Sequence, residues 1–208
     1  MVNRHWLLRL PTAVVGVLIA FSGATALAGT LAEKLASANH VLLMRHAFAP
    51  GVGDPPGYSL EKCETQRLLD DEGKQQATHT GDWLRSQGVT SAKVYASAWC
   101  RCQQTAERLN FGAITVTPAL ASVFDVPEQT LARNTALQQL ISKALAAKGH
   151  KPGQAIILVT HQVNIQAFVG ENTKSGEMVL ARVTKRGKLL GYQMYSAARP
   201  GDRASNTP

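Results

Sequence analysis

Residues 40–47 read His-Val-Leu-Leu-Met-Arg-His-Ala, and this stretch decides the fold. Val41 to Met44 form a short, continuous apolar run, which is typical of a strand buried on both faces of a parallel sheet. Arg45 and His46 follow at the carboxyl end of this strand, where ligands bind in open α/β sheets. A permanent cation beside an imidazole at that edge predicts an anion site that contains a nucleophile or a base.

Two later segments repeat this arrangement. Residues 94–96 are a second strand candidate, followed by Arg101, and residues 155–159 are the clearest buried strand, followed by His161. An amphipathic helix is expected over residues 130–148, and a closing hairpin over residues 177–195. Strands that alternate with helices predict an α/β fold with parallel strands. Such a sheet would bring both histidines and both arginines to one edge.

The first 28 residues have the layout of a secretory signal peptide. Arg4 and Arg9 give a basic start, residues 12–21 are apolar, and residues 26–28 read Ala-Leu-Ala, a small-x-small cleavage site. The apolar run is short for a bilayer span, which needs about 20 residues. We therefore expect cleavage after Ala28 and a periplasmic or secreted protein, rather than an uncleaved membrane anchor.

Cleavage would leave one domain, residues 29–198, and a small, polar tail, residues 199–208, which we expect to be disordered. Loss of the two arginines takes the net charge from +8 to +6. A basic protein favours anionic ligands, but no block of Lys and Arg interleaves with aromatic residues, so we do not expect a nucleic-acid partner. We expect no stable membrane insertion after cleavage, and the sequence predicts no oligomeric state.

The sequence contains three cysteines, Cys63, Cys100 and Cys102. In an exported protein one disulfide with one remaining thiol is expected. Cys100 and Cys102 are too close to bridge each other easily, so Cys63 would pair with one of them. Three buried free thiols are the alternative.

Two imidazoles and two guanidinium groups at one point suit phosphoryl chemistry. Guanidinium groups bind phosphate oxygens bidentately, a neutral imidazole can attack phosphorus, and a second imidazole can stabilise the charge on the oxygens. The sequence has no cluster of Asp, Glu and His at metal-ligand spacing, so we expect neither a metal ion nor another cofactor.

Four motifs occur in the order found in a known family. They are Leu43–Ala47 (strand plus Arg-His), Leu69–Ala77 with Gly73 and Gln76, Ser97–Ala106 with Arg101, and Val159–His161. The chain thereby resembles the histidine phosphatase (phosphoglycerate mutase-like) superfamily over roughly Val41 to Tyr195. The resemblance implies a three-layer α/β/α fold with a mostly parallel central sheet. It also implies that His46 is the nucleophile that forms phosphohistidine, and that Arg45, Arg101 and His161 form the phosphate pocket.

The chain departs from the family pattern at the proton donor to the leaving oxygen. Residues 120–125 lack the glutamate that many members have, and Gln162 stands where another branch places an aspartate. Asp125 is our candidate acid, with Glu128 as the alternative. If neither serves, the substrate would need a good leaving group, such as that of an acyl phosphate or phosphohistidine. Ala47 also replaces the usual glycine after the histidine.

A loop rich in Pro and Gly, residues 48–57, follows His46 and makes hydrolysis a better expectation than mutase activity. We therefore expect an exported, metal-independent phosphatase that acts on a small phosphomonoester, possible substrates including a phosphorylated cell-envelope component. The alternative is a non-catalytic module that binds phosphate or a phosphosugar. A pH–rate profile distinguishes the two, because a module of the second kind gives no rate.

Overall fold

The computed structural model describes residues 29–148 and 153–197. The expected signal peptide (1–28) and the expected disordered tail (199–208) lie outside these residues, so both stay predictions. Among the helices that the structure describes, none combines the length and the apolar character needed to cross a bilayer.

The fold is organised around a six-stranded sheet. Its strands lie in the order β3 (Ile114–Val116), β2 (Ala92–Ala96), β4 (Ala155–Thr160), β1 (His40–Arg45), β5 (Met178–Val183) and β6 (Leu189–Tyr195). The first four strands are parallel, and β5 and β6 form the expected antiparallel hairpin against β1. Because β1 and β4 are neighbours with Arg45 opposite Thr160, the residues that follow them, His46 and His161, leave the sheet side by side.

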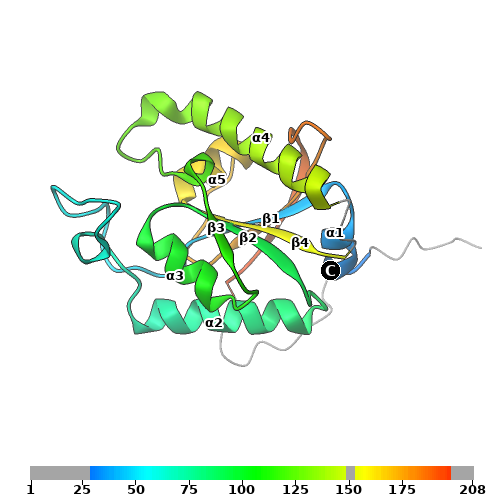
Figure 1. Cartoon of the computed structure of the whole chain (residues 1–208), viewed down its shortest axis with the longest axis horizontal. Helices are drawn as coiled ribbons and strands as arrows, with labels where there is room; N and C mark the ends of the chain where they lie inside the picture. The colour runs from blue at the N-terminus through cyan, green and yellow to red at the C-terminus, as the bar shows by residue number, and fades with distance from the viewer. Residues whose placement is uncertain (1–28, 149–152, 198–208) are drawn as a thin grey trace, which may run out of the picture.

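Helices cover both faces of the sheet. Figure 1 shows α4 (Thr130–Lys148) and α5 (Gln162–Val169) on one face, and α2 (Asp71–Ser86) and α3 (Cys100–Arg108) on the other. The short helix α1 (Leu31–Ala36) packs on the same side as α2 and α3. Three 3₁₀ turns, η1 (Cys63–Thr65), η2 (Pro118–Leu120) and η3 (Pro127–Gln129), lie in the connections.

Side chains along β1 point alternately to the two faces of the sheet, and this alternation explains the three layers. Leu42 and Met44 pack in the core cluster on the α2–α3 side, whereas Val41 and Leu43 pack in the cluster on the α4–α5 side. All four side chains are fully buried. A strand that is apolar at every position must be covered on both faces, so the predicted three-layer fold with a mostly parallel sheet is confirmed.

The start of α2 holds the chain that follows His46. The Asp70 side chain caps this helix by accepting a hydrogen bond from the Gly73 N–H at 2.8 Å. Gly73 packs directly against the Phe48 carbonyl, because a Cβ at this position would lie 1.8 Å from its oxygen. Gln76 Oε1 accepts from the Phe48 N–H at 2.9 Å, and its Nε2 donates to the Ser175 carbonyl. The Gly-x-x-Gln motif therefore positions the beginning of the Pro/Gly loop.

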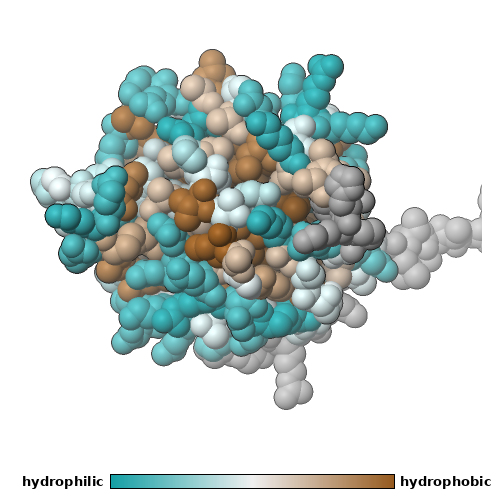
Figure 2. All heavy atoms as spheres, in the orientation of Figure 1, coloured by the Kyte–Doolittle hydropathy of each residue, from teal (hydrophilic) through white to brown (hydrophobic). Residues whose placement is uncertain are grey.

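β3 forms one edge of the sheet, and Val116 at its end is 45% exposed. Figure 2 shows apolar residues near the middle of the face that β3 crosses in Figure 1, bordered by hydrophilic residues. Hydrophilic residues cover much of the rest of this face.

Candidate active site

His46 lies at the carboxyl end of β1 with its side chain turned inward. The residue is 2% exposed, and its N–H donates to the Thr160 carbonyl at 3.0 Å. The His46 Nδ1 lies 2.8 Å from the Ala47 carbonyl oxygen. Since a carbonyl only accepts hydrogen bonds, Nδ1 carries the proton and Nε2 keeps its lone pair. The ring is thus held in the tautomer that a nucleophilic Nε2 requires.

His161 occupies the N-cap position of α5, directly after β4, and its side chain makes no capping hydrogen bond to the helix. Its ring lies edge-on to the His46 ring, with the centroids 5.7 Å apart, and the residue is 3% exposed. The His161 Nε2 lies 2.9 Å from the Ser97 hydroxyl, which comes from the end of β2. Three neighbouring strands therefore contribute to one site, as the sequence predicts for residues at strand ends.

Three guanidinium groups line a cavity of about 260 Å³ that also contains both histidines. They belong to Arg45, Arg67 and Arg101. Arg45 Nη1 donates to the Thr173 carbonyl at 2.7 Å, while the Nε atoms of Arg45 and Arg101 are buried and have no hydrogen-bond partner within the described residues. An unsatisfied buried donor costs about 1–3 kcal/mol. The cavity therefore fits an anionic ligand with several acceptor oxygens.

The same environment keeps both imidazoles neutral. Burial, with smaller contributions from the charges of Arg101 and Arg45, lowers the pKa of His46 to about 3, and the hydrogen bond to the Ala47 carbonyl opposes this shift. Burial also lowers the pKa of His161 well below its ordinary value, with further contributions from His46 and Arg101. A neutral His46 at neutral pH has a lone pair available to attack phosphorus.

Asp54 and Arg67 are residues of this site that the sequence analysis missed. Both line the cavity, and the side chain of Asp54 is only 2% exposed, in an ion pair with Arg101. Arg67 holds the Pro/Gly loop, because its Nε donates to the Gly53 carbonyl at 2.8 Å and its Nη1 to the Ala49 carbonyl at 2.6 Å. The available signal was one charged residue inside the Pro/Gly segment and one a few residues after it, on the connection that follows the strand with the nucleophile.

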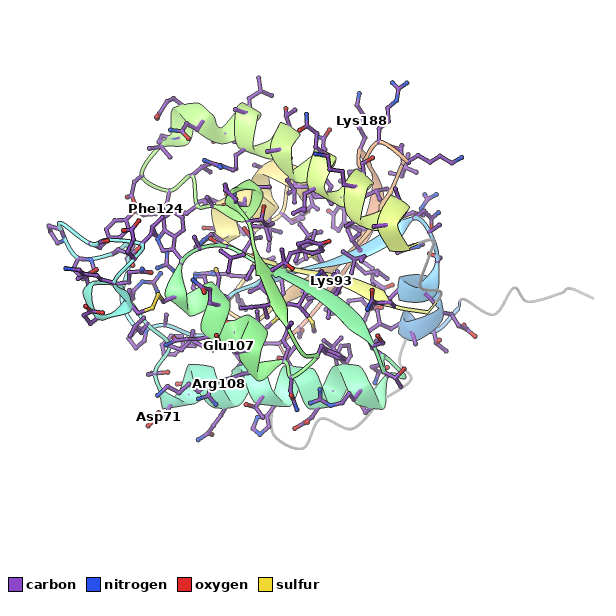
Figure 3. All side chains as sticks on the ribbon, in the orientation of Figure 1. Asp71, Lys93, Glu107, Arg108, Phe124 and Lys188 are labelled. Atoms are coloured by element: carbon purple, nitrogen blue, oxygen red, sulfur yellow. A yellow bond between two sulfur atoms is a disulfide. The ribbon has the colours of Figure 1, made fainter. Side chains whose placement is uncertain are left out.

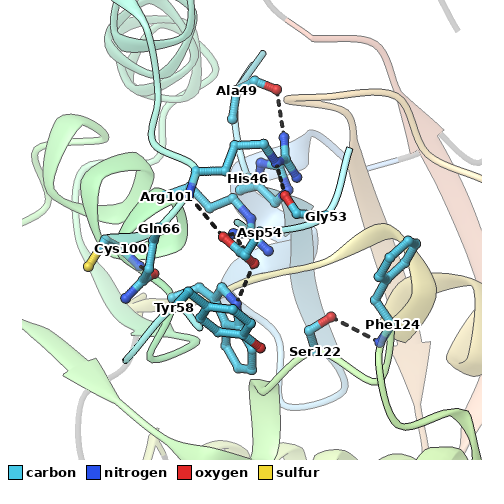
Figure 4. A network of polar contacts seen from close by, with 12 residues as sticks. His46, Ala49, Gly53, Asp54, Tyr58, Gln66, Cys100, Arg101, Ser122 and Phe124 are labelled. Atoms are coloured by element: carbon cyan, nitrogen blue, oxygen red, sulfur yellow. Dashed lines mark hydrogen bonds and ion pairs between the residues drawn. The ribbon is translucent and has the colours of Figure 1, made fainter. Parts of the chain in front are cut away.

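The Pro/Gly loop and the residues after it, 48–67, form one wall of the cavity and are attached to α3. A disulfide joins Cys63 to Cys100, and Gln66 Oε1 accepts from the Cys100 N–H at 2.9 Å. Figure 4 shows Gln66 and Cys100 beside Arg101, which directly follows Cys100 in the sequence. The prediction that Cys63 pairs with Cys100 or Cys102 is confirmed, and Cys102 is the buried free thiol. Burial raises the pKa of this thiol to about 12.

The two candidate acids lie in different places. Asp125 is exposed at the cavity, and the Tyr58 hydroxyl donates to its Oδ2 at 3.4 Å. Glu128 lies in η3 and does not line the cavity. Phe124, which precedes Asp125, is 52% exposed and lies beside the wall loop near Gly53 (Figure 3). The structure thus brings Asp125 to the site with the four other predicted residues, and it leaves Glu128 outside.

Within residues 29–148 and 153–197, no group of three or more His, Cys, Asp or Glu side chains is placed to hold a metal ion. The cationic character of the cavity comes from the guanidinium groups that line it.

A family model of the histidine phosphatase superfamily (branch 1) matches residues 41–123. This segment of the chain is therefore similar to the histidine phosphatase superfamily. It contains Arg45, His46, Arg67 and Arg101, and it ends before Asp125 and His161. The sheet brings His161 to the superfamily segment through the pairing of β1 with β4.

Curated relatives match the same region. The chain is 39% identical over 70 residues to the mitochondrial serine/threonine-protein phosphatase Pgam5 of Drosophila grimshawi, and 38% identical over 71 residues to that of Drosophila virilis. Each match covers 34% of this chain and only 22% of the relative's length.

Solved structures share the histidine phosphatase fold over a longer span. Mycobacterial hydrolase 1 superimposes with a TM-score of 0.56 at 13% identity, over 77% of this chain and 98% of that one. A mycobacterial glucosyl-3-phosphoglycerate phosphatase with inorganic phosphate gives a TM-score of 0.54 at 13% identity, over 77% and 97% of the two chains. These similarities establish the fold.

Proposed function

We propose that the protein is an exported, metal-independent phosphatase that hydrolyses a small phosphomonoester through a phosphohistidine intermediate on His46. The observation that carries the proposal is the neutral His46 ring, fixed with Nε2 unprotonated, in a cavity that three guanidinium groups line. The names of the relatives, a serine/threonine-protein phosphatase and a glucosyl-3-phosphoglycerate phosphatase, support phosphoester hydrolysis as the class of reaction.

The proposed reaction has two steps. In the first, the lone pair of His46 Nε2 forms a bond to phosphorus while the bond from phosphorus to the ester oxygen breaks, and the leaving oxygen takes a proton from Asp125. In the second, a water oxygen attacks phosphorus, the P–N bond breaks, and the water proton returns to Asp125. Arg45, Arg101 and His161 stabilise the charge on the phosphoryl oxygens in both steps.

The rim of the cavity offers both apolar and polar side chains to the leaving group. Val52 is 88% exposed and Phe124 is 52% exposed, and both line the cavity together with Asp125 and Gln162. Because these two apolar side chains are exposed at the cavity, they can pack against a hydrocarbon chain or the face of a ring in the leaving group. A screen of phosphorylated metabolites and cell-envelope fragments, with His46→Ala as the blank, would identify the substrate.

The direct test of the proposed activity is hydrolysis of p-nitrophenyl phosphate by the protein cleaved after residue 28. We expect turnover in the presence of a metal chelator and none above the blank for His46→Ala. Equal rates for the two proteins would refute the role of His46, and loss of activity in the chelator would refute metal independence.

A non-catalytic phosphate-binding module is the second candidate, and one observation favours it. Asp125, the acid that we propose, is exposed and has only a long hydrogen bond to Tyr58. The module would bind inorganic phosphate through Arg45 and Arg101 and give negligible turnover at every pH. A measurable rate that falls at high pH decides for the enzyme.

Export is part of the proposal and rests on residues 1–28. The Cys63–Cys100 disulfide supports it, because such bonds persist in oxidising compartments. Expression of the full chain in a bacterium, followed by N-terminal sequencing, should give a periplasmic or secreted protein that begins at Gly29. An intact N-terminus in the cytosolic fraction would refute export.

A further inference from the structure

Asp54 brings a carboxylate from the Pro/Gly loop into the cavity that the guanidinium groups of Arg45, Arg67 and Arg101 line. Its Oδ1 accepts from Arg101 Nη1 at 2.8 Å and from the Arg67 N–H at 2.9 Å. Its Oδ2 accepts from Arg101 Nη1 at 3.0 Å and from Trp99 Nε1 at 3.0 Å. Figure 4 shows the carboxylate beside Arg101. Donors therefore occupy all of the roughly four lone-pair sites of the carboxylate.

This saturation excludes Asp54 from proton transfer. A carboxylate that accepts four hydrogen bonds, two of them from a guanidinium group, has no lone-pair site left for a substrate proton. Whatever Asp54 does for the reaction it must do through Arg101 and Trp99.

Asp54 takes one side of the Arg101 guanidinium and leaves the other free. Both of its contacts to this group go to Nη1, while Arg101 Nε is buried without a partner in the described part of the chain. The free Nε–Nη2 edge of a guanidinium is one that binds two oxygens of a phosphoryl group at once. The ion pair thus fixes the plane of the Arg101 guanidinium and leaves its Nε–Nη2 edge available to bind a phosphoryl group.

The same carboxylate also reaches the second histidine. Its other partner, Trp99, is 7% exposed, and the Trp99 ring lies edge-on to the His161 ring with the centroids 5.2 Å apart. Asp54 therefore contacts Arg101 directly and is linked to His161 through Trp99.

We propose that Asp54 is a positioning residue that orients Arg101, and through Trp99 also His161, for the transferred phosphoryl group. The claim rests on the proposed function. It makes the wall of residues 48–67 a working part of the site, held in place by Arg67 and by the Cys63–Cys100 disulfide. Burial of an ion pair has a desolvation cost, which lowers stability. A displacement of a catalytic group by about 1 Å lowers the rate about 100-fold, so an ion pair that prevents this displacement raises kcat.

A rival interpretation predicts the opposite change in oxyanion affinity when Asp54 is removed. If Asp54 were an internal anion that competes with phosphate for Arg101, its removal would free the guanidinium and tighten oxyanion binding. If Asp54 orients Arg101, its removal leaves a misplaced guanidinium and weakens the binding of a transition-state-like oxyanion.

The test compares wild type, Asp54→Asn and the control Asp71→Asn by kinetics with p-nitrophenyl phosphate and by calorimetric titration with orthovanadate. Asp71→Asn removes the same charge from an exposed side chain outside the cavity. We expect Asp54→Asn to lower kcat about 10- to 100-fold with little change in KM, and to weaken orthovanadate binding by a similar factor. The control should match wild type in both measurements.

A double variant separates positioning from a general structural role. In an Arg101→Gln background, adding Asp54→Asn should lower kcat/KM by a clearly smaller factor than it does in the wild-type background, because only the route through Trp99 and His161 remains. Full additivity of the two losses would overturn the proposal, as would tighter orthovanadate binding or unchanged kcat in the single variant. If Asp54→Asn unfolds, Asp54→Glu replaces it: the charge stays, the guanidinium is displaced, and wild-type kcat would overturn the claim.

The proposed function can fail separately. A wild type that binds orthovanadate without turnover refutes the enzyme, and the orthovanadate affinities of the variants still test Asp54. If the wild type neither binds orthovanadate nor turns over substrate, both the proposed function and the role of Asp54 are refuted.

Discussion

The disulfide gives the most quantitative prediction. Replacement of both partners, Cys63→Ser with Cys100→Ser, opens a covalent loop whose ends are 37 residues apart in the sequence. For a loop of this length, chain entropy in the unfolded state corresponds to about 4 kcal/mol of stabilisation. For a domain of this size about 1 kcal/mol corresponds to 2–4 °C, so the double variant should melt about 8–16 °C lower than wild type.

The loss should also reach the active site. Cys100 is the first residue of α3 and directly precedes Arg101, and Cys63 belongs to the wall that carries Asp54. We expect KM for p-nitrophenyl phosphate to rise in the double variant even at temperatures where the protein is fully folded, because the wall is then attached to α3 by non-covalent contacts alone, such as the Gln66–Cys100 hydrogen bond and the Asp54–Arg101 ion pair.

The assay is thermal unfolding followed by circular dichroism, with and without a reductant. Wild type in reductant should approach the melting temperature of the double variant, and reductant should not affect the double variant itself. Cys102→Ser serves as the control, because this thiol is not bonded to another cysteine and reductant should still shift its melting temperature. A double variant within about 2 °C of wild type would refute the reasoning, since it corresponds to at most about 1 kcal/mol.

Three further predictions concern α2, the acid and the histidines. Gly73→Ala should destabilise the protein by about 1–3 kcal/mol in urea unfolding, because the new Cβ meets the Phe48 carbonyl; a gain of about 1 kcal/mol, usual for glycine to alanine in a helix, would contradict this. Asp125→Asn should slow formation of the phosphoenzyme from an alkyl phosphate about 10²- to 10⁴-fold and leave its formation from p-nitrophenyl phosphate almost unaffected, since in this step only the poor leaving group needs a proton; equal losses in rapid-quench measurements of this step would exclude Asp125 as the acid. Folding lowers the pKa of both His46 and His161, so below about pH 6.5 the unfolded chain binds more protons than the folded chain. The free energy of unfolding should therefore drop by up to about 1.4 kcal/mol per pH unit for each histidine, and for His46 this continues down to about pH 3; a flat profile in urea titrations between pH 4.5 and 7.5 would contradict the neutral pair.

The central strands and four of the site residues could be predicted because local pattern determines them. The apolar runs of β1 and β4 admit only a strand covered on both faces, and parallel strands place their carboxyl ends at one edge. Arg45, His46, Arg101 and His161 therefore meet in the structure as the sequence suggested, while their chemical roles stay predictions.

Asp54 and Arg67 could not be predicted in the same way. They lie outside the helices and strands, so no periodicity marks them, and their positions depend on contacts made only in the folded chain, such as Arg67 with the carbonyls of Ala49 and Gly53. The choice of Cys100 over Cys102 is also set by tertiary structure, because α3 turns the Cys102 side chain into the core, where it is fully buried. Local sequence contains neither piece of information.

The most direct test of the central claim is to locate the covalent intermediate. The protein is mixed with substrate, quenched within milliseconds under alkaline denaturing conditions, digested, and analysed by mass spectrometry for a phosphoryl group that is labile to acid. The account predicts one such group, on His46, absent from His46→Ala and accumulating when the second step is slow. A phosphoryl group on His161 or on a serine, or steady turnover with no phosphorylated peptide at any quench time, would contradict it.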